Sequence, residues 1–325
     1  MSTIGVRVQG LPLALRGLTK TYGQVRAVNA VDADVLPGRV TALLGPNGSG
    51  KTTTLRMLLG LARPDAGTAL VGGRPYSAIP HPQRVVGASL EASFHPGRTG
   101  WDHLRTLAPA VGASDARIAR VLGQVGLHEA KDRKVGGYSL GMRQRLALAG
   151  TLLGDPAVLV LDEPANGLDP QGIAWLRDLL RHLAAEGRTV LVSSHHLGEV
   201  QAGVDDVLVL SRGRLVHASS LTEMMAMSRP VVAVAGPDAP GIRAALESAG
   251  WVVEPSADGF DVRVGAAGRE LSTAAVGHAL FTAGLEVHRL GQRGGDLEST
   301  FLQVVSGQLP GRVRPLLASD ERGVA

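Results

Sequence analysis

Residues 40–52 read Val-Thr-Ala-Leu-Leu-Gly-Pro-Asn-Gly-Ser-Gly-Lys-Thr. The first five residues predict a short buried strand, and the glycine-rich turn after them opens a predicted helix over about 52–61. Glycines allow the backbone N–H groups of such a turn to surround phosphate oxygens, and the helix N-terminus adds positive potential. We therefore predict a nucleotide-phosphate loop, in which the lysine reaches the β- and γ-phosphates and the hydroxyl of Thr52 ligates Mg²⁺. The predicted binding residues are Gly45, Pro46, Asn47, Gly48, Ser49, Gly50, Lys51, Thr52 and Thr53.

A second informative stretch covers residues 158–164 and ends with two acidic residues before a proline. It reads Val-Leu-Val-Leu-Asp-Glu-Pro. An apolar strand here delivers two carboxylates at its C-terminal end, where α/β proteins place their ligands. Asp162 is suited to holding Mg²⁺, and Glu163 is suited to polarising an attacking water as general base. Without the phosphate loop, two acids after a strand would be typical of a helix start. Together the two stretches indicate hydrolysis of a nucleotide.

The remaining pattern predicts an α/β domain over residues 12–227 and a smaller domain after it. Strands alternate with helices, which indicates a mainly parallel sheet. Residues 99–154 are helical, and Met142, Leu146, Ala149 and Leu153 share one helix face. The predicted segments are strands within 12–36 and 66–91, strands 158–161, 189–193 and 207–210, a helix over 170–186, and a short helix from 195.

Beyond residues 228–230 the pattern changes to β-α-β-β-α-β, the order of the ferredoxin-like fold. We expect this accessory α+β domain over 231–305 and a mobile tail over 306–325. Its predicted elements are strands 231–235, 251–254, 260–264 and 285–290 and helices 240–249 and 270–283, with a short helix 296–305 after them. A fold of this kind hosts many functions and by itself names no ligand.

Composition excludes several classes of protein. The 325 residues include no cysteine, so disulfides and zinc–thiolate sites are excluded. No stretch approaches the roughly 18 uncharged apolar residues of a membrane span, and the N-terminus does not resemble a secretory signal. Net charge is only +4 and aromatic residues make up 3%, so we expect no nucleic-acid partner.

The family is indicated by residues 138–145, Tyr-Ser-Leu-Gly-Met-Arg-Gln-Arg. They resemble the signature motif of ATP-binding cassette (ABC) transporter ATPases, usually Leu-Ser-Gly-Gly-Gln. Ser139 and Gly141 match that motif, whereas Tyr138, Leu140 and Met142 depart from it. Ser139 can cap a helix whose exposed N–H groups bind a γ-phosphate, although the stretch alone would equally fit a plain helix cap.

Further positions resemble the same family. Tyr22 stands where the family has an aromatic residue that stacks on adenine. Asp169, in Asn-Gly-Leu-Asp over 166–169, resembles the acid of the dimer-interface loop and also reads as an N-cap before proline. His195 resembles the switch histidine that contacts the γ-phosphate and holds the water, and His196 is expected on the surface. Glu91 replaces the glutamine that the family uses to contact Mg²⁺, and we predict that it keeps the metal and coupling roles.

The resemblance implies an ATP- and Mg²⁺-dependent hydrolase of the P-loop ABC ATPase fold, with a helical subdomain over about 92–154. Its catalytic residues would be Lys51, Glu163 and His195, and its metal ligands Thr52, Glu91 and Asp162. It further implies a head-to-tail homodimer that powers a separate membrane permease from the cytoplasmic face, in a branch similar to the daunorubicin- and bacitracin-resistance ATPases.

Three alternatives remain at this point. A soluble ABC-type ATPase acting on the ribosome usually carries two cassettes, whereas this chain has one phosphate loop. A small-molecule kinase would not need the Asp-Glu pair with a downstream histidine. A non-catalytic binder would not need all four of Lys51, Asp162, Glu163 and His195.

Overall fold

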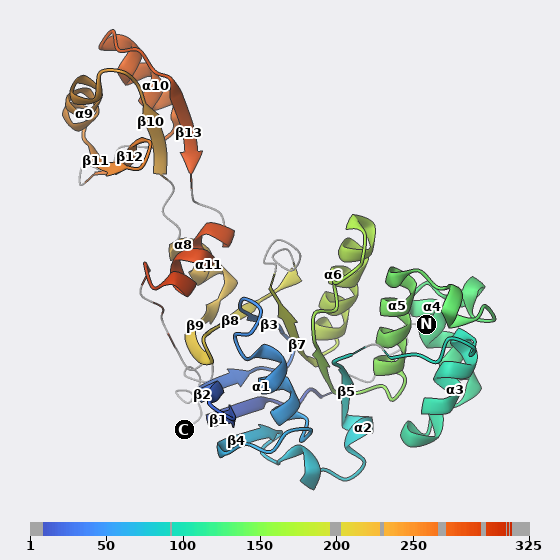
Figure 1. The fold of residues 1–325 in the computed structure, drawn as a ribbon. Coiled ribbons are helices and arrows are strands. Elements are labelled where there is room, and N and C mark those ends of the chain that lie inside the picture. The colour runs from blue at the N-terminus through green and yellow to red at the C-terminus, as the bar shows by residue number, and fades with distance from the viewer. Residues whose placement is uncertain are drawn as a thin grey trace, which may run out of the picture. The chain divides into compact units, whose positions relative to one another are not determined.

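The computed structural model describes residues 9–91, 93–195, 203–227, 231–265, 271–293 and 297–309, together with residues 311 and 313. The chain forms two compact units, one with the residues up to Leu221 and from Val304 onward, the other spanning Thr222–Gln303 (Figure 1). His196, the rest of the short helix predicted from 195, and most of the predicted tail 306–325 lie outside the described residues.

A six-stranded sheet forms the centre of the first unit, in the order β5-β6-β7-β3-β8-β9. Its strands are β3 (Val40–Leu44), β5 (Val86–Ser89), β6 (Val158–Leu161), β7 (Thr189–Ser194), β8 (Asp206–Ser211) and β9 (Arg214–Ser220). Neighbouring strands from β5 to β8 run parallel, and β9 pairs antiparallel with β8. Because β6, β7 and β3 are adjacent and parallel, their C-terminal ends bring Asp162, His195 and Gly45 to the same edge of the sheet.

A three-stranded antiparallel sheet, in the order β2-β1-β4, completes this part of the unit. Its strands are β1 (Leu13–Tyr22), β2 (Val25–Val35) and β4 (Ala66–Val71). Helix α1 (Lys51–Leu58) buries Leu55 and Leu58 in one cluster with Leu18 of β1 and Leu43 of β3. The phosphate loop is therefore anchored between two sheets.

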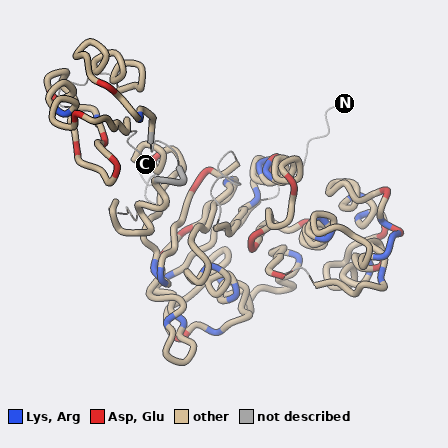
Figure 2. Tube along the Cα trace, turned by 45° about the horizontal axis from the view of Figure 1, so that its top comes forward, with Lys and Arg blue, Asp and Glu red and all other residues tan. Residues whose placement is uncertain are grey.

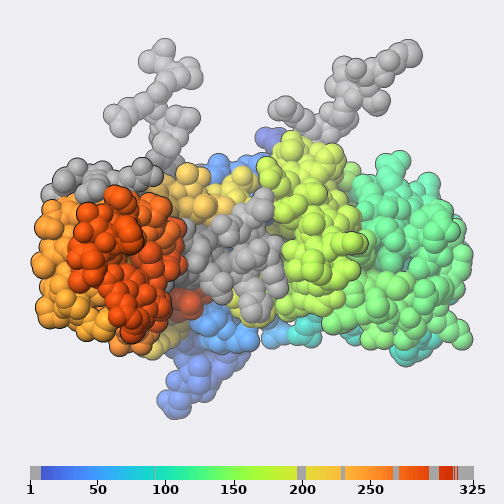
Figure 3. Space-filling model, turned by 90° about the horizontal axis from the view of Figure 1, so that it is seen from above, coloured from blue at the N-terminus to red at the C-terminus, as the bar shows by residue number. Residues whose placement is uncertain are grey.

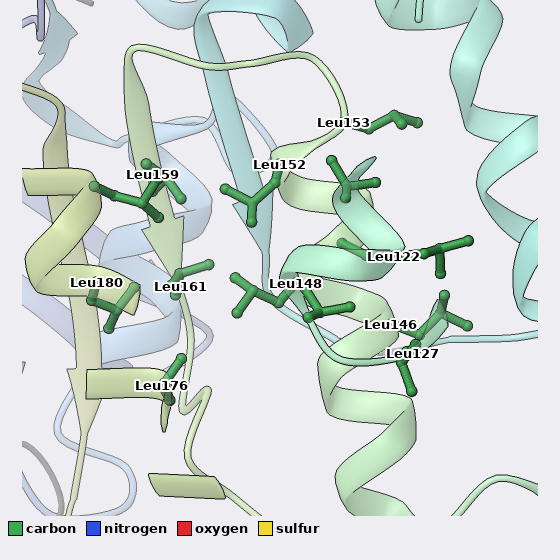
Figure 4. Packing of buried hydrophobic residues seen from close by; sticks show 14 of the residues in the cluster. Leu122, Leu127, Leu146, Leu148, Leu152, Leu153, Leu159, Leu161, Leu176 and Leu180 are labelled. Atoms are coloured by element: carbon green, nitrogen blue, oxygen red, sulfur yellow. The ribbon is translucent and has the colours of Figure 1, made fainter. Parts of the chain in front are cut away.

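Three helices form the predicted helical subdomain: α3 (Gly100–Val111), α4 (Asp115–Gln124) and α5 (Leu140–Leu152). Each begins at a side-chain N-cap, supplied in turn by Thr99, Ser114 and Ser139. Leu146 and Leu148 of α5 lie in one leucine-rich cluster with Leu122 of α4 and Leu159 of β6 (Figure 4). Helix α6 (Pro170–Ala185) lies beside this subdomain (Figures 1 and 3).

The second unit contains a four-stranded sheet in the order β11-β12-β10-β13, with every described pairing antiparallel. Its elements are β10 (Val231–Ala235), α9 (Ala239–Ser248), β11 (Trp251–Ser256), β12 (Gly259–Val264), α10 (Thr273–Thr282) and β13 (Arg289–Arg293), with α8 (Leu221–Met227) before them and α11 (Leu297–Ser306) after them. Trp251, Val262 and Leu280 belong to its core. The element order and sheet order are those of the split ferredoxin-like arrangement.

The predicted fold class is confirmed, with local differences. Strand β9 was not predicted, and β13 begins at Arg289 rather than at residue 285. Within 66–91, only β4 and β5 are strands, and the residues between them include short helices at Tyr76–Ala78 and α2 (Pro82–Val85). Lys and Arg are spread over both units (Figure 2). Among the described residues, no helix is both long enough and apolar enough to cross a membrane.

Candidate active site

The phosphate loop follows β3 and has the backbone that its glycines predict. Gly48 and Gly50 adopt φ of 78° and 104°, values that other residues rarely adopt. A Cβ at Gly50 would also collide with the carbonyl oxygen of Ala27, so only glycine fits there. The Ser49 hydroxyl is buried and finds no hydrogen-bond partner within the described structure. A phosphate oxygen would satisfy such a group, so the loop fits the ligand that its sequence predicts.

Lys51 is buried at the start of α1 and is held by the loop itself. Its Nζ donates to the carbonyl oxygens of Gly45 at 2.7 Å and Pro46 at 3.4 Å, and lies 3.3 Å from Glu163 Oε1. A buried ammonium group needs such partners, because an unpaired charge in the interior is strongly unfavourable. The same ammonium can bind phosphate oxygens if it exchanges these partners for them.

Asp162 accepts hydrogen bonds from two hydroxyl groups. Thr52 Oγ1 donates to its Oδ2 at 2.7 Å, and Ser193 Oγ donates to its Oδ1. The backbone N–H of Asp162 donates to Ser89 O on β5 at 2.8 Å. The carboxylate is thereby fixed beside the first turn of α1, and its predicted metal-holding role stays a prediction.

Glu163 has the most constrained backbone of the site. Its φ is 48°, in the left-handed region, which costs about 1–3 kcal/mol for a residue other than glycine. Its N–H donates to Ser193 Oγ at 2.9 Å, and its Oε2 lies 2.8 Å from His195 Nδ1. The carboxylate thus lies between the Lys51 ammonium and the His195 imidazole. These contacts orient it, which a general base requires.

A cavity of about 330 Å³ lies in front of these groups. Its lining residues are Thr52, Ser89, Leu90, Glu91, Gln144, Asp162, Glu163 and Asn166. Glu91 is among these lining residues, but its side chain is 77% exposed and its Oε1 lies 2.7 Å from an Arg56 guanidinium nitrogen, so its metal and coupling roles stay predictions. Because both side chains are exposed, this ion pair offsets only part of the negative charge that a glutamate introduces where the resembled family has a neutral glutamine.

The residues at this cavity fit a magnesium ion. In the part of the chain that the structure describes, no three His, Asp or Glu side chains form a ready-made metal cluster. Magnesium does not need one, because it usually binds through one or two carboxylates, substrate phosphates and retained waters. The oxygen donors of Thr52 and Asp162, in hydrogen-bond contact beside the phosphate loop, are of the required type.

Four other predicted binding residues make their described contacts away from this cavity. Ser139 accepts from Met142 N and caps α5, and Asp169 accepts from Gly172 N and caps α6 before Pro170, so the predicted N-cap at Asp169 is confirmed. Tyr22 is half-exposed, with the Lys20 ammonium 5.4 Å from its ring centroid.

Gly141, the fourth of these residues, follows Leu140, which is exposed and contacts Gly167 of the 166–169 loop. Among the described residues, the side-chain hydrogen bonds of Ser139 and Asp169 stay within the first turns of their own helices and do not reach the phosphate loop of the same chain. The described contacts therefore assemble Lys51, Thr52, Asp162, Glu163 and His195, and leave Ser139 and Gly141 outside this set, whereas Gln144 of the same helix lines the cavity.

Three residues that lie in the quoted motifs were not predicted as site residues, yet the structure gives them defined contacts in or near the site. Ser193 bonds to both acids, and Gln144 Nε2 donates to Glu163 O at 3.5 Å. Tyr138, a departure from the family motif, is buried and donates its hydroxyl to Ala130 O at 2.7 Å, and burial raises its pKa. Its hydroxyl occupies the space that a Cβ at Gly100 would need. For Ser193 the deciding feature is the parallel pairing of β6 with β7, which places residue 193 beside residue 162.

Comparison with known proteins agrees with this geometry. The family model described as ABC transporter matches residues 28–166. The bacitracin transport ATP-binding protein BcrA of Enterococcus faecalis is 39% identical over 216 residues, which cover 65% of this chain and 70% of that protein. The lantibiotic transport ATP-binding protein SrtF of Streptococcus pyogenes is 36% identical over 205 residues, 63% of this chain and 89% of that protein.

Solved structures agree as well. A structure described as the ATP-binding subunit of an ABC transporter superposes with a TM-score of 0.60 at 28% identity, covering 66% of this chain and 92% of that one. The dimeric post-hydrolysis ATP-binding cassette MJ0796, bound to ADP and Pi, shares the fold with a TM-score of 0.59 at 23% identity, covering 64% and 98%. This chain therefore belongs to the ATP-binding subunits of ABC transporters, the family whose members hydrolyse ATP to drive transport.

Proposed function

We propose that this chain is the ATPase subunit of an exporter for antibiotics or related drugs, and that it hydrolyses ATP as a head-to-tail homodimer. The observation that carries the dimer is the distribution of the site. Lys51, Asp162, Glu163 and His195 come together within one chain, whereas Ser139 bonds to the first turn of its own helix, and among the described residues no side-chain hydrogen bond joins Ser139 or Gly141 to these four. The exposed helix N-terminus at Leu140 would then face the γ-phosphate held by the partner.

The residues of this chain divide the chemistry among them. The phosphate loop binds the triphosphate through its N–H groups and through Lys51, once that ammonium leaves its carbonyl partners. Thr52, Asp162 and Glu91 would hold Mg²⁺, which when bound neutralises charge on the β- and γ-phosphate oxygens. Glu163 takes the proton of the attacking water as that water approaches the γ-phosphorus. His195 orients Glu163 through Nδ1 and would contact the γ-phosphate.

The transport role is supported by the relatives. The proteins named for bacitracin and lantibiotic transport share more than a third of their residues with this chain over the aligned region. A daunorubicin/doxorubicin resistance ATP-binding protein of Streptomyces peucetius is 38% identical over 214 residues. We therefore propose a membrane permease on a separate chain as the partner, with this chain docked at the cytoplasmic face. A permease found beside this chain, whose co-expression moves it to the membrane fraction, would support this part.

Mixing two inactive variants tests the head-to-tail dimer. Lys51→Ala removes the phosphate-binding ammonium. Gly141→Asp places a negative charge where the partner's γ-phosphate would lie, and an acid in the first turn of a helix is otherwise tolerated. If each active site uses Lys51 of one protomer and Gly141 of the other, a mixed dimer keeps one intact site. An equal mixture then regains about a quarter of wild-type turnover, since half of the dimers are mixed.

A matched control uses two defects in the same half of the site. Lys51→Ala mixed with Glu163→Gln leaves no intact site in any dimer, so this mixture stays inactive. Lack of recovery in the first mixture would contradict the head-to-tail arrangement. Recovery in both mixtures would contradict the assignment of Lys51 and Glu163 to one protomer.

A further inference from the structure

Ser193 lies on β7 between the two acids of the site, although its own side chain carries no charge. Its side chain is buried, and the residue has an exposed fraction of 0%. The hydroxyl donates its proton to Asp162 Oδ1 and accepts the N–H of Glu163 at 2.9 Å. A hydroxyl has one proton to donate, so these two bonds fix its orientation.

The two bonds act on different parts of the acids. The first holds the side chain of Asp162, whose other oxygen accepts from Thr52 at 2.7 Å. The second holds the main chain of Glu163 in the left-handed conformation, φ 48°, that a residue with a Cβ rarely adopts. A buried N–H without a partner is strongly unfavourable, so the Ser193 oxygen stabilises this turn directly.

The sheet places the hydroxyl there. Leu161 pairs with Val192 in the parallel register of β6 and β7, so residue 193 follows one position later beside residue 162. Both strands are buried along their whole length, which keeps this register fixed. The position of the hydroxyl therefore depends on two rigid strands rather than on a loop.

We propose that Ser193 is a positioning residue of ATP hydrolysis, which couples the metal-holding carboxylate of Asp162 to the general base Glu163. It acts through these two acids rather than on the reacting atoms. Through one hydroxyl it sets the direction of the Asp162 carboxylate and the backbone from which the Glu163 side chain extends. This inference rests on the proposed hydrolytic function and assigns a role to a residue that was not among the predicted site residues.

A buried hydroxyl elsewhere in the sheet provides the matched control. Thr41 lies on β3, next to β7, and is also fully buried. Its hydroxyl finds no hydrogen-bond partner among the described residues. Thr41→Val removes a buried hydroxyl with the shape retained and without breaking a bond to either acid, so it measures what any such loss does to the sheet.

The experiment compares the full-length wild type with Ser193→Ala, Ser193→Thr and Thr41→Val. Steady-state ATPase assays give kcat and KM for ATP. Equilibrium binding of Mn²⁺ to the protein with ADP present, followed by electron paramagnetic resonance, reports on the metal site without turnover. Thermal unfolding of each protein checks that the fold is retained.

We expect Ser193→Ala to lower kcat by about 10- to 100-fold, the range expected for losing a hydrogen bond to a charged group together with one to a strained backbone. KM for ATP should change by less than about twofold, because the phosphate loop is intact, and Mn²⁺ affinity should fall by about 10-fold, the low end for losing a hydrogen-bond partner of a metal ligand. Thr41→Val should stay within about twofold of wild type in all three measures. Ser193→Thr, which keeps the hydroxyl, should recover most of kcat.

The proposal is overturned if Ser193→Ala turns over at the wild-type rate, or if Thr41→Val loses as much activity as Ser193→Ala. Unchanged Mn²⁺ affinity in Ser193→Ala would also overturn it. Should the added methyl of Ser193→Thr prevent folding, the comparison of the other two variants still decides. If the wild type itself fails to hydrolyse ATP, the proposed function fails, while the Mn²⁺ measurement continues to test Ser193 independently.

Discussion

Asp155→Asn is predicted to destabilise the first unit, because Asp155 joins the helical subdomain to the central sheet. Its Oδ1 accepts from Arg117 of α4 at 3.0 Å and from Arg188, next to β7, at 2.9 Å. Arg188 is almost fully buried and also donates to Pro156 O at 2.7 Å. The backbone of Asp155 has φ 53°, and asparagine tolerates this conformation as aspartate does. The substitution therefore removes charge without adding backbone strain.

The magnitude follows from these contacts. Charge-assisted hydrogen bonds are roughly twice as strong as neutral ones, so two weakened bonds amount to about 1–2 kcal/mol. The Asp155 side chain is 54% exposed, and solvent screening keeps the value at the lower end of that range. For a unit of this size each kcal/mol shifts Tm by about 2–4 °C, which for about 1 kcal/mol predicts a loss of roughly 2–4 °C by calorimetry at pH 7.

The pH dependence provides the sharper test. Burial alone would raise the pKa of Asp155, but hydrogen bonds and charges from Arg188 and Arg117 outweigh it and bring the pKa below its usual 3.8. A carboxyl with a lowered folded-state pKa stabilises the protein above the unfolded-state pKa and loses that effect as pH falls through the folded value. The gap between wild type and Asp155→Asn should stay constant from pH 7 to about 5 and shrink below about 4.

Arg105→Ala is the control, because this exposed arginine on α3 forms no ion pair within the described structure. It should leave Tm within about 1 °C of wild type. Equal Tm values for wild type and Asp155→Asn at pH 7 would refute the reasoning, as would a gap that widens on acidification.

Three further outcomes are expected. Glu163→Gln should lower the rate of single-turnover hydrolysis by about 10²- to 10⁴-fold while ATP still binds. The variant should accumulate as an ATP-bound dimer in size-exclusion chromatography. Normal turnover would refute the general-base role. Glu91→Gln should change basal and partner-stimulated ATPase rates, because it removes a carboxylate from the cavity and frees Arg56, and unchanged rates in both assays would contradict a role for Glu91. Tyr138→Phe should cost about 1 kcal/mol in urea unfolding because the bond to Ala130 O is lost, and an unchanged midpoint would show that this bond contributes nothing.

Sequence patterns predicted the structure correctly where a motif directly follows a single apolar strand. Strand 158–161 was predicted with the bounds that the structure has, since four consecutive buried residues require a parallel strand covered on both faces. Strand β9 was missed because its residues, Arg214 to Ser220, include His217 and two serines and lack an apolar run. Its burial depends on pairing with β8, which lies beyond what a local pattern records.

The residues of the candidate site also divide into those that a local pattern predicts and those that depend on the assembled sheet. Lys51, Thr52, Asp162 and Glu163 lie in local motifs whose spacing carries the chemistry, and the structure places them in contact. Ser193 lies in the stretch 193–195 that resembles the switch-histidine motif, but the motif assigned a role to His195 only, because a serine at a strand end is ordinary. Its importance arises from the register between two strands whose central residues are about thirty positions apart, and only the assembled sheet supplies that register.

The contacts of Lys51 bear on how nucleotide binding and dimer closure are linked. In this structure the buried ammonium is satisfied by two carbonyl oxygens and by Glu163, which in turn contacts His195. A bound triphosphate has to replace these partners, so its net affinity is the difference between two sets of bonds that each satisfy the same charge. A single chain then retains only part of the gross interaction energy. In the proposed dimer, contacts from the N-terminus of the partner's helix α5 would bind the triphosphate without displacing any internal partner of Lys51. Closing of the dimer should therefore contribute more to ATP retention than the phosphate loop alone.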